Sequence, residues 1–309
     1  MTVSIPRRRM LRRAGAVCFT LGLTLVPLVA PERGDTARAS QVETIPADAR
    51  RIVSVGGSLT EIVYALGAQD RLVARDSTST FPADAVALPD VGYMRALSPE
   101  GVLSVQPDAI LLLEGSGPPE AVEVLRKASV PMVFVPERFD SDGILTKIRA
   151  VGEALGLPAE TKRFEAEVAA DLAQTAAATA DIAERKRVLF VLSLQGGKIL
   201  ASGNGTAAAG IMTLAGAENA VGGFNGYRQL TDEAVIEAQP DVVLVMAREG
   251  DLAISRDELL AQPAISATPA GKNGDVIAMD GLYLLGFGPR TAQAARDLAT
   301  DLYGDRAGN

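Results

Sequence analysis

An internal repeat constrains the fold of this chain more than any other sequence feature. Residues 97–111 align with residues 230–244 at a constant offset of 133 positions. Seven pairs are identical between the two copies, among them the polar and Pro pairs Glu100 and Glu233, Gln106 and Gln239, Pro107 and Pro240, and Asp108 and Asp241. In each copy a hydroxyl residue, Ser98 or Thr231, stands where a helix N-cap is expected, and Pro-Asp ends the helix. Two copies of one such unit predict two similarly built lobes.

The segments around the repeat predict α/β lobes with parallel sheets. The apolar runs 109–113 and 242–246 follow the two helices and are typical of buried parallel strands. A looser likeness relates residues 64–70 to residues 213–219. Each lobe also offers a strand, a Gly-rich turn and a helix, in that order. Two such lobes explain a length of 309 residues better than one long sheet does.

A long uninterrupted helix is expected between the lobes. Residues 159–185 contain no Gly or Pro, and Phe164, Val168 and Leu172 recur at helical spacing as one apolar stripe. A helix of about 27 residues spans roughly 40 Å, which is enough to cross from one lobe to the other. The alternative is an exposed Ala-rich helix within one domain, but the repeat on both sides favours a bridging helix. The predicted fold is therefore α/β, with two similar βα lobes joined by a long rigid helix and a ligand cleft between them.

Domain boundaries follow from these features. They are a signal peptide at 1–39, a first lobe at 50–140, a connecting helical segment at 141–186, and a second lobe at 187–309. The last helix is expected at 291–303, because Pro289 stands near a helix start. The rigid connector predicts a small hinge motion of the lobes rather than a large closure.

The first 39 residues predict an export signal. Arginines cluster at 7–13, an uncharged apolar stretch follows at 14–30, and small residues provide a cleavage site near Ala39. A retained membrane anchor is the alternative, but a spanning helix needs roughly 20 apolar residues. The arginine run resembles the twin-arginine export signal. We therefore expect a periplasmic protein whose single cysteine, Cys18, leaves with the signal.

The composition after cleavage narrows the range of functions. Removal of the leader leaves 23 basic and 36 acidic residues, a net charge of −13, which argues against nucleic-acid partners. The chain has no His, so His-ligated zinc or haem and any Ser-His-Asp or Cys-His catalytic machinery are excluded. Loss of Cys18 leaves neither a disulfide nor a Cys-ligated cluster.

A ligand site is expected on loops beyond the carboxyl ends of the strands, where open α/β lobes bind their ligands. The candidate loops are 56–58, 92–96, 114–119, 195–197, 224–228, 248–250 and 282–287. Among them, Tyr93 and Arg95 place a phenol two residues from a guanidinium. Tyrosinate is a hard ligand suited to ferric iron and is one of the axial ligands of haem. Because a free phenol ionises only near pH ~10, bound Fe(III) and the neighbouring cation would both favour the charged form.

Several of these candidates have a plainer interpretation. Tyr93 could be an ordinary surface tyrosine, and Tyr227, Arg228 and Arg248 on the second lobe could likewise be surface groups. The turns 56–58 and 203–206 could bind an anion at a helix N-terminus, or they could be strand-to-helix turns with a Ser or Thr cap. Tyr283 and Phe287 could line the apolar face of the cleft or pack in the core.

Three segments resemble haem-binding periplasmic proteins of ABC haem importers. They are residues 55–67, residues 92–101 with the motif Gly-Tyr-Met-Arg, and residues 279–290. The Gly-Tyr-Met-Arg motif is the specific part, whereas the other segments are similar to the wider superfamily that binds cobalamin and ferric siderophores. The resemblance covers the chain from residue 50 to its C-terminus.

This resemblance implies a set of haem contacts. Tyr93 would be the axial ligand of the haem iron, and Arg95 would support the tyrosinate. Arg248 would approach the opposite face of the haem, with Arg228 and Tyr283 as further contacts. Some relatives add a His ligand from the second lobe. This chain has no His, so five-coordinate or water-ligated iron is implied.

The resemblance also implies partners. A monomeric carrier would deliver haem to an inner-membrane ABC permease dimer with its ATPase, and an outer-membrane haem receptor system would act upstream. The superfamily docks by placing one glutamate per lobe against arginine clusters of the permease, which carries onto Glu100 and Glu233. Both also stand in the first turn of a predicted helix, where a carboxylate is stabilised by the helix dipole.

Two other functions stay open. The same fold could carry a corrinoid or a ferric siderophore, for which Tyr93 would be unnecessary as a metal ligand. An exported hydrolase or haem-modifying enzyme is the third hypothesis. The absence of His, of a Gly-x-Ser-x-Gly elbow and of a paired-acid motif argues against it, so we expect a non-enzymatic carrier.

Overall fold

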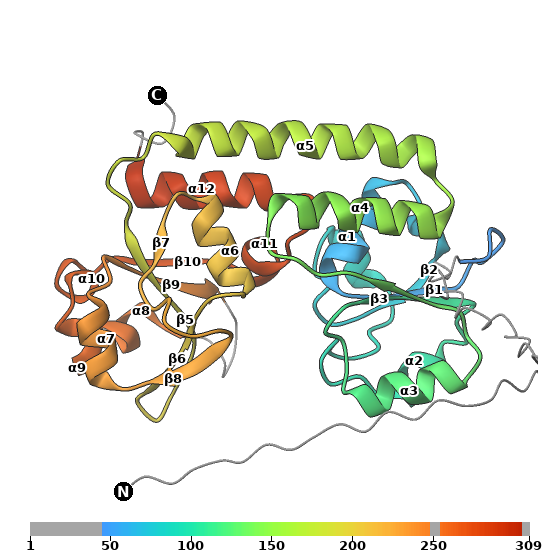
Figure 1. The fold of residues 1–309 in the computed structure, drawn as a ribbon. Helices are drawn as coiled ribbons and strands as arrows, with labels where there is room; N and C mark the ends of the chain where they lie inside the picture. The colour runs from blue at the N-terminus through green and yellow to red at the C-terminus, as the bar shows by residue number, and fades with distance from the viewer. Residues whose placement is uncertain (1–44, 248–253, 305–309) are drawn as a thin grey trace, which may run out of the picture. The chain divides into compact units, whose positions relative to one another are not determined.

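Two separate sheets organise the protein, whose computed structural model describes residues 45–247 and 254–304 (Figure 1). The predicted leader, 1–39, and Arg248 lie outside these residues. Of the helices in the described ranges, none combines the length and the apolar character that a membrane span requires. The two-lobe α/β architecture predicted from the repeat is confirmed.

The first lobe is built on a four-stranded parallel sheet with the order β2-β1-β3-β4. Its strands are β1 (Ile52–Val55), β2 (Leu72–Arg75), β3 (Ala109–Leu113) and β4 (Met132–Val135). Its helices are α1 (Gly57–Ala65), α2 (Pro99–Ser104), α3 (Pro119–Lys127) and α4 (Ser141–Leu155), with short 3-10 turns at Gln69–Arg71 and Ala83–Ala87. Every residue of β1 and β3 is buried, because α1 and α4 cover one face of the sheet and α2 and α3 the other (Figure 1).

The second lobe has a mixed six-stranded sheet. Strands β10, β9 and β5 run parallel, and the sheet continues through the antiparallel strands β6 and β8, while β7 pairs with the start of β5. The strands are β5 (Arg187–Gln195), β6 (Lys198–Ser202), β7 (Glu218–Asn219), β8 (Tyr227–Leu230), β9 (Val242–Ala247) and β10 (Val276–Asp280). The expected order of strand, Gly-rich turn and helix holds, with a hairpin between β5 and the turn that the sequence did not indicate. Gly196 and Gly197, both at positive φ, close that hairpin.

Seven helices of the described chain complete the second lobe. They are α6 (Ala207–Leu214), α7 (Asp232–Ala238), α8 (Arg256–Leu260), α9 (Pro263–Ser266), α10 (Pro269–Asn273), α11 (Gly281–Leu285) and α12 (Thr291–Tyr303). The last of them begins and ends at the residues predicted from the sequence. Helix α7 lies on the side of its sheet away from α12, as α2 lies on the side of its sheet away from α4 (Figure 1).

The repeat forms the same substructure in both lobes, α2 with β3 and α7 with β9. The hydroxyls of Ser98 and Thr231 each accept a hydrogen bond from the backbone amide three residues further on, so both predicted N-caps are confirmed. The identical glutamines explain how the two helices end. Gln106 and Gln239 adopt positive φ values of 48° and 41°, the left-handed conformation that terminates a helix.

The bridging helix is α5 (Pro158–Ala180), whose 23 residues span about 34 Å. It is four residues shorter than the predicted range. Val168 and Leu172 are buried, as the apolar stripe predicted. The stripe continues with Thr175 and Thr179, whose hydroxyls donate hydrogen bonds to carbonyls of α12 and α6 respectively. The same helix packs along α4, so it contacts both halves of the structure (Figure 1).

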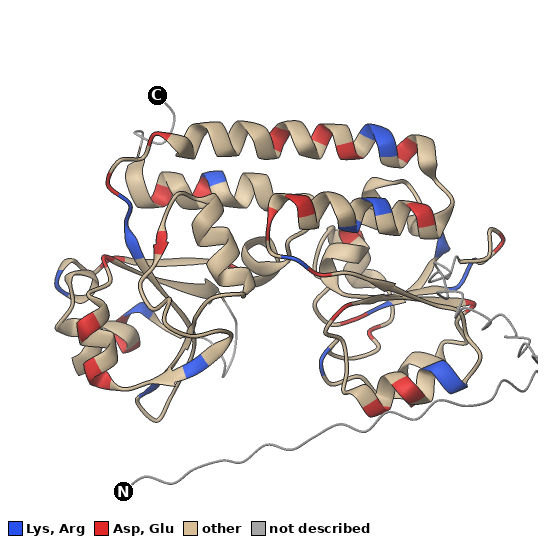
Figure 2. Cartoon of the chain, viewed as in Figure 1, with Lys and Arg blue, Asp and Glu red and all other residues tan. Residues whose placement is uncertain are grey.

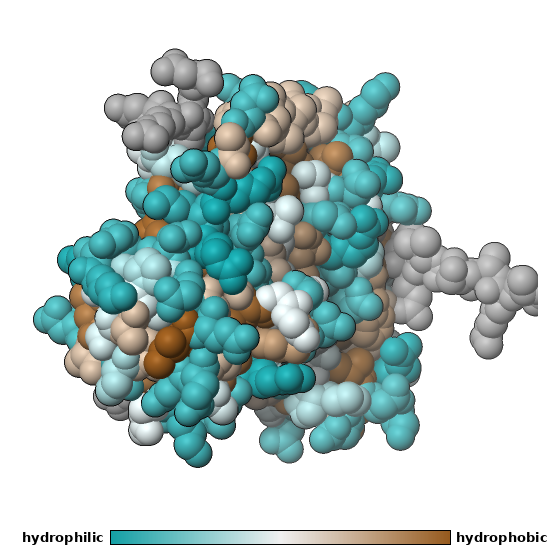
Figure 3. Space-filling model, turned by 60° about the vertical axis from the view of Figure 1, so that its left-hand side comes forward, coloured by the Kyte–Doolittle hydropathy of each residue, from teal (hydrophilic) through white to brown (hydrophobic). Residues whose placement is uncertain are grey.

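Apolar packing runs without a break through both lobes. One core cluster extends from β1 and β3 through α4, α5 and α12 to one face of the second sheet, and a second cluster covers the other face of that sheet. On the face of the molecule drawn in Figure 3 the apolar patches are small and separated by hydrophilic side chains. The shared core explains why the two lobes behave as parts of one folded unit.

Candidate ligand site between Tyr93 and Tyr227

The turn that carries Tyr93 is fixed by its neighbours on both sides. Met94 and Leu97 are buried, whereas Tyr93 is 46% exposed. The carbonyl of Tyr93 accepts a hydrogen bond from the amide of Ala96 at 2.8 Å. Gly117, in the loop before α3, pairs with the turn twice: its amide donates to the Met94 carbonyl and its carbonyl accepts from the Leu97 amide. A fixed backbone therefore displays an exposed phenol.

Asp90 sets the direction in which the chain enters this turn. Its carboxylate accepts a hydrogen bond from the Gly92 amide at 2.8 Å and forms an ion pair with Arg75 at 2.7 Å. Gly92 has a φ of 100°, a conformation that side-chain-bearing residues rarely adopt. The glycine of the Gly-Tyr-Met-Arg motif is thus required by the backbone that presents Tyr93.

The second lobe contributes Tyr227 and Arg228 from the start of β8. Tyr227 is half-buried and packs against the main core cluster, while Arg228 is exposed. The Arg228 guanidinium lies 4.7 Å from the centroid of the Phe224 ring, a cation–π contact that holds it near the strand end. A phenol and a guanidinium are therefore adjacent on this lobe as well.

Tyr227 lies within electrostatic range of the turn that carries Tyr93 and Arg95. Burial raises the pKa of Tyr227 from its ordinary value, Tyr93 raises it further, and Arg95 and the Thr206 hydroxyl lower it. The structure thus brings together Tyr93, Arg95 and Tyr227. The sequence suggested Tyr227 only weakly, since its relation to Arg95 depends on the pairing of β6 with β8.

Tyr283, expected as a haem contact, belongs to a different cluster. Its hydroxyl donates a hydrogen bond to Asp297 of α12 at 2.7 Å, and its ring lies 5.0 Å from the Arg290 guanidinium. Burial and the Asp297 carboxylate raise the pKa of Tyr283. With Phe81 it lines a cavity of about 580 Å³ beside α12. Its hydroxyl is therefore committed to α12. Phe287, in contrast, is fully buried, so the core-packing interpretation is confirmed.

The turn 56–58 is not an open anion site. The Asp76 carboxylate, which is fully buried, accepts a hydrogen bond from the Gly56 amide at 3.0 Å, and the Thr78 hydroxyl accepts one from the Gly57 amide. The chain's own carboxylate thus occupies the N-terminus of α1. At the second turn Thr206 caps α6, as the plainer interpretation proposed.

The two candidate docking glutamates are exposed, each in the first turn of its helix. At Glu233 the helix-start amide and the Thr231 hydroxyl lower the pKa, which fits the helix-dipole role considered from the sequence. Figure 2 shows further Asp and Glu residues on α3 and α7. The docking role of Glu100 and Glu233 stays a prediction.

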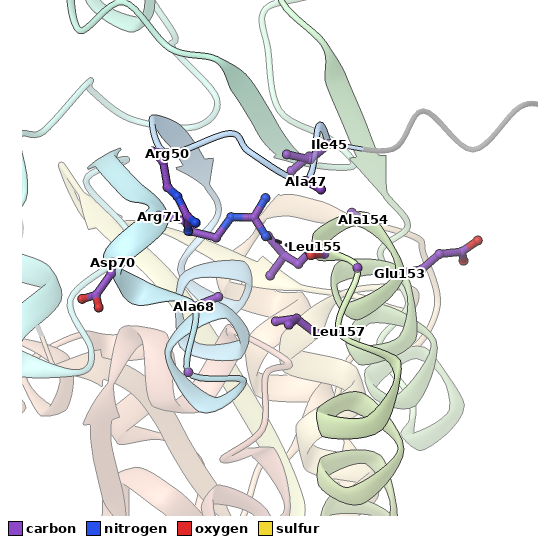
Figure 4. Close-up of a pocket in the computed structure, with 12 residues that line it drawn as sticks. Ile45, Ala47, Arg50, Ala68, Asp70, Arg71, Glu153, Ala154, Leu155 and Leu157 are labelled. Atoms are coloured by element: carbon purple, nitrogen blue, oxygen red, sulfur yellow. Dashed lines mark hydrogen bonds between the residues drawn. The ribbon is translucent and has the colours of Figure 1, made fainter.

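A cavity of about 530 Å³ lies elsewhere on the first lobe (Figure 4). Arg71 points into it and donates hydrogen bonds to the carbonyls of Ala49, Leu155 and Pro46. Because these carbonyls occupy the guanidinium, Arg71 fastens residues 45–49 to the end of α4. This cavity is explained by chain packing rather than by a ligand.

Sequence reasoning missed two charged contacts that connect the lobes. Lys147 of α4 is fully buried, and Arg290 forms a bidentate pair with Glu61 of α1. Apart from Glu137, which pairs with Lys147 from 10 residues away, their partners lie 89 to 229 residues away along the chain, so no local pattern could have indicated them. Among the described residues no group of three or more Asp and Glu side chains is arranged to hold a metal ion.

Comparison with known proteins identifies the class. The family model for periplasmic binding proteins matches residues 52–282, and the chain belongs to this family. It is the substrate-binding component of an ABC importer. The predicted resemblance to haem-binding periplasmic proteins is confirmed: the solved structure of BhuT, a periplasmic haem-binding protein in complex with two haems, is 39% identical with a TM-score of 0.77. The match covers 84% of this chain and 99% of that one.

Curated sequence relatives include proteins with a different ligand. A Bacillus subtilis ABC transporter substrate-binding lipoprotein without an assigned ligand is 27% identical over 86% of this chain and 84% of its own length. The vitamin B12-binding protein of Pectobacterium atrosepticum is 25% identical over 82% of this chain and 88% of its own. The family is therefore established, and the ligand has to be argued from the site.

Proposed function

We propose that this substrate-binding protein captures ferric haem in the periplasm and delivers it to an inner-membrane ABC permease, with Tyr93 as the iron ligand. The observation that carries the proposal is an exposed phenol on a turn whose backbone is fixed by hydrogen bonds, with Arg95 two residues further on and Tyr227 within electrostatic range. The similarity to BhuT supports the choice of haem, because that relative is closer in identity than the vitamin B12-binding protein.

The chemistry of the residues present favours tyrosinate ligation. The chain has no His, and Cys18 lies in the predicted leader, so neither of the other common strong haem ligands is offered by the mature protein. Tyr93 is exposed, and Arg95 stands two residues further on. Tyr227 is half-buried, and desolvation raises its pKa, so it stays a neutral phenol at physiological pH and acts as a hydrogen-bonding group instead.

The arginines would bind the acidic periphery of the ligand. Haem carries two propionate carboxylates, and guanidinium groups bind carboxylates in a planar, bidentate manner. Arg95 and Arg228 are exposed, and they belong to different lobes. They therefore suit a ligand whose carboxylates reach both. Arg248, which lies outside the described residues, keeps its proposed place on the opposite face, and Tyr283 its proposed role as a more distant contact.

A corrinoid carrier is the second candidate, and it rests on the vitamin B12-binding relatives. Cobalamin already carries its own axial base and has no propionate carboxylates. A corrinoid site would therefore leave the pairing of Tyr93 with Arg95 without a function. This difference makes Tyr93 the residue that separates the two ligands.

An enzymatic function is disfavoured, because the one pair among the described contacts that resembles a catalytic nucleophile and its base is buried. Lys147 Nζ lies 3.0 Å from the Ser58 hydroxyl, the arrangement of a Ser-Lys dyad. Ser58 is 1% exposed and Lys147 is fully buried, so no substrate can reach the hydroxyl. We therefore propose a carrier rather than a catalyst. Its partners are the permease dimer and its ATPase, docked through Glu100 and Glu233, and an outer-membrane receptor system upstream.

Haemin titration of the purified mature chain tests the proposal. We expect one-to-one or two-to-one binding with a high-spin tyrosinate charge-transfer band. Tyr93→Phe should erase that band and weaken retention by roughly 100-fold or more, since even partners that only support a metal ligand account for 10- to 100-fold. Tyr227→Phe is the matched control and should keep the band. Binding of cyanocobalamin with no response to haemin would overturn the proposal in favour of a corrinoid carrier.

A further inference from the structure

Lys147 is a fully buried cation at the boundary between the lobes. Its ammonium group donates to the Ser58 hydroxyl of α1 at 3.0 Å and forms an ion pair with Glu137, in the loop after β4, at 2.8 Å. Both of these acceptors belong to the first lobe. Burial lowers the pKa of Lys147 and raises the pKa of Glu137, and each partner counteracts the shift of the other.

The same ammonium group reaches the second lobe. It donates to the carbonyl of Phe287 at 3.0 Å and lies 3.4 Å from the carbonyl of Gly286. Phe287 has a φ of 46°, which is a rare and costly conformation for a bulky residue. Lys147 therefore binds the carbonyl of a residue, Phe287, whose backbone is strained.

Close packing surrounds this contact. The Phe287 ring meets the Phe139 ring edge-on, with centroids 5.3 Å apart. A Cβ atom on Gly210 of α6 would come within 2.4 Å of the Phe139 carbonyl, and one on Gly288 within 3.2 Å of the Ser58 side chain. The boundary thus has no room for either lobe to slide past the other at this level.

A second charged contact crosses the boundary nearby. Arg290 donates to both carboxylate oxygens of Glu61, at 2.7 and 3.0 Å, and its guanidinium stacks on the Phe81 ring at 3.7 Å. Glu61 and Phe81 belong to the first lobe, whereas Arg290 immediately precedes α12. Two independent cations, Lys147 and Arg290, therefore connect the lobes.

Buried ion pairs are poor sources of stability, because the cost of removing both charges from water offsets their attraction. Their advantage is positional: the three N–H donors of this ammonium group are shared among four oxygens that come from both lobes, so the contacts depend on how the lobes are placed. Apolar side chains in place of Lys147 and its partners would stabilise the fold equally well. The position of Lys147 across the boundary points instead to control of the lobe arrangement.

We propose that Lys147 is a positioning residue that fastens the two lobes at one separation, so that the site between Tyr93 and Tyr227 is pre-formed before ligand arrives. The part of this inference that concerns haem rests on the proposed function. The fastening itself does not, and it adds a specific device to the rigidity expected from α5 alone.

Distances between spin labels measure the fastening directly. The mature chain has no cysteine, so Lys127→Cys on α3 and Glu237→Cys on α7 place one label on each lobe at exposed positions. Pulsed electron resonance then gives the distribution of inter-lobe distances with and without haemin. We expect a narrow distribution in the otherwise wild-type protein and no displacement of its mean when haemin is added.

Lys147→Met keeps the length of the side chain and removes the ammonium group. We expect it to broaden the ligand-free distribution at least twofold and haemin to narrow it again. Its haemin affinity should fall about five- to tenfold, in proportion to the time spent out of the competent arrangement. Arg149→Met is the control on the same helix, because Arg149 faces outward to Glu165. It should leave the distribution and the affinity unchanged.

Several outcomes would overturn the inference. One is a Lys147→Met protein that folds and gives the wild-type distribution. Another is a wild-type distribution that is broad, or whose mean shifts with haemin; this arm decides even if Lys147→Met does not fold. Failure of haemin to bind the wild type and Arg149→Met would refute the proposed function, while the ligand-free distributions would still test the fastening.

Discussion

In the first lobe, Asp108 accepts hydrogen bonds from the backbone amides at the start of β1, and in the second lobe Asp241 does the same at the start of β5. The arginines at these strand starts repeat as well. Arg51 donates its guanidinium to the carbonyls that end α2, and Arg187 donates to the Ala238 carbonyl at the end of α7. The Pro-Asp pairs of the repeat thus make the same contacts in both lobes: an aspartate accepts from backbone amides at a strand start, and the neighbouring arginine donates to carbonyls at a helix end. We call this set of contacts the clasp.

Beyond this clasp the lobes differ. β1 passes directly into α1, whereas β5 turns back through β6 before α6 begins. Tyr93 stands on a turn and Tyr227 begins β8, although each tyrosine follows a glycine at positive φ just before its copy of the repeat. The aligned segments 97–111 and 230–244 hold each lobe together, and the candidate ligand contacts Tyr93 and Tyr227 come from the residues just before these segments.

The largest effect on haem uptake is expected from the two glutamates of the repeat that are proposed to dock on the permease. Glu100→Lys combined with Glu233→Lys should reduce permease-dependent haem uptake to background, because each charge reversal sets like charges against the arginines expected on the permease. Haemin binding should be unchanged. The measurement is uptake by cells or vesicles that contain the permease.

Neighbouring acids provide the control for this experiment. Glu120→Lys on α3 combined with Glu237→Lys on α7 changes the net charge equally and should leave most of the uptake intact. Normal uptake by the Glu100/Glu233 variant would exclude a docking role. Comparing the two single variants shows whether the permease treats the lobes as equivalent.

The sequence predicts best what each lobe holds locally. The caps Ser98 and Thr231, the buried strands after them and helix 291–303 all depend on residues close together in the chain. Tyr93 could be singled out for the same reason, because the glycine before it and the arginine after it belong to one short motif.

Contacts between distant segments could not be predicted in this way. The Asp76 carboxylate accepts a hydrogen bond from the Gly56 amide at the N-terminus of α1, from a loop 20 residues away. No pattern in either segment predicts this contact. The second-lobe partners of Lys147, the carbonyls of Gly286 and Phe287, lie 139 and 140 residues further along the chain. The hairpin β5–β6 was missed because its short apolar strands have the same composition as one longer buried strand.

Removing the clasp from either lobe should reduce stability without touching the ligand site. Asp108→Ala and Asp241→Ala each leave backbone amides unpaired, at a cost of about 1–2 kcal/mol. Asp241 is the less exposed of the two, so we expect the larger loss in the second lobe. Denaturant unfolding measures both. Glu167→Ala, at an exposed position of α5, is the control and should stay within about 0.5 kcal/mol. A loss confined to one lobe would break the structural equivalence.

The smallest effect compares the two arginines of the site. A cation near a phenol lowers the phenol's pKa, as Arg95 does for Tyr227, so its removal makes every nearby phenolate harder to form. Arg95→Ala should therefore raise the pH midpoint of the tyrosinate haem complex by about half a unit, the scale of an exposed charge pair. High salt should diminish this shift, and Arg95→Lys, which keeps the charge, should restore most of the wild-type midpoint.

Arg228→Ala should weaken haemin binding a few-fold without moving the midpoint, because the Arg228 guanidinium is held over the Phe224 ring. Spectra recorded across a pH series measure both quantities. Equal midpoint shifts in the two variants would mean that the lobes contribute charge to the phenolate alike, and the division between an iron-binding lobe and a facing lobe would be wrong.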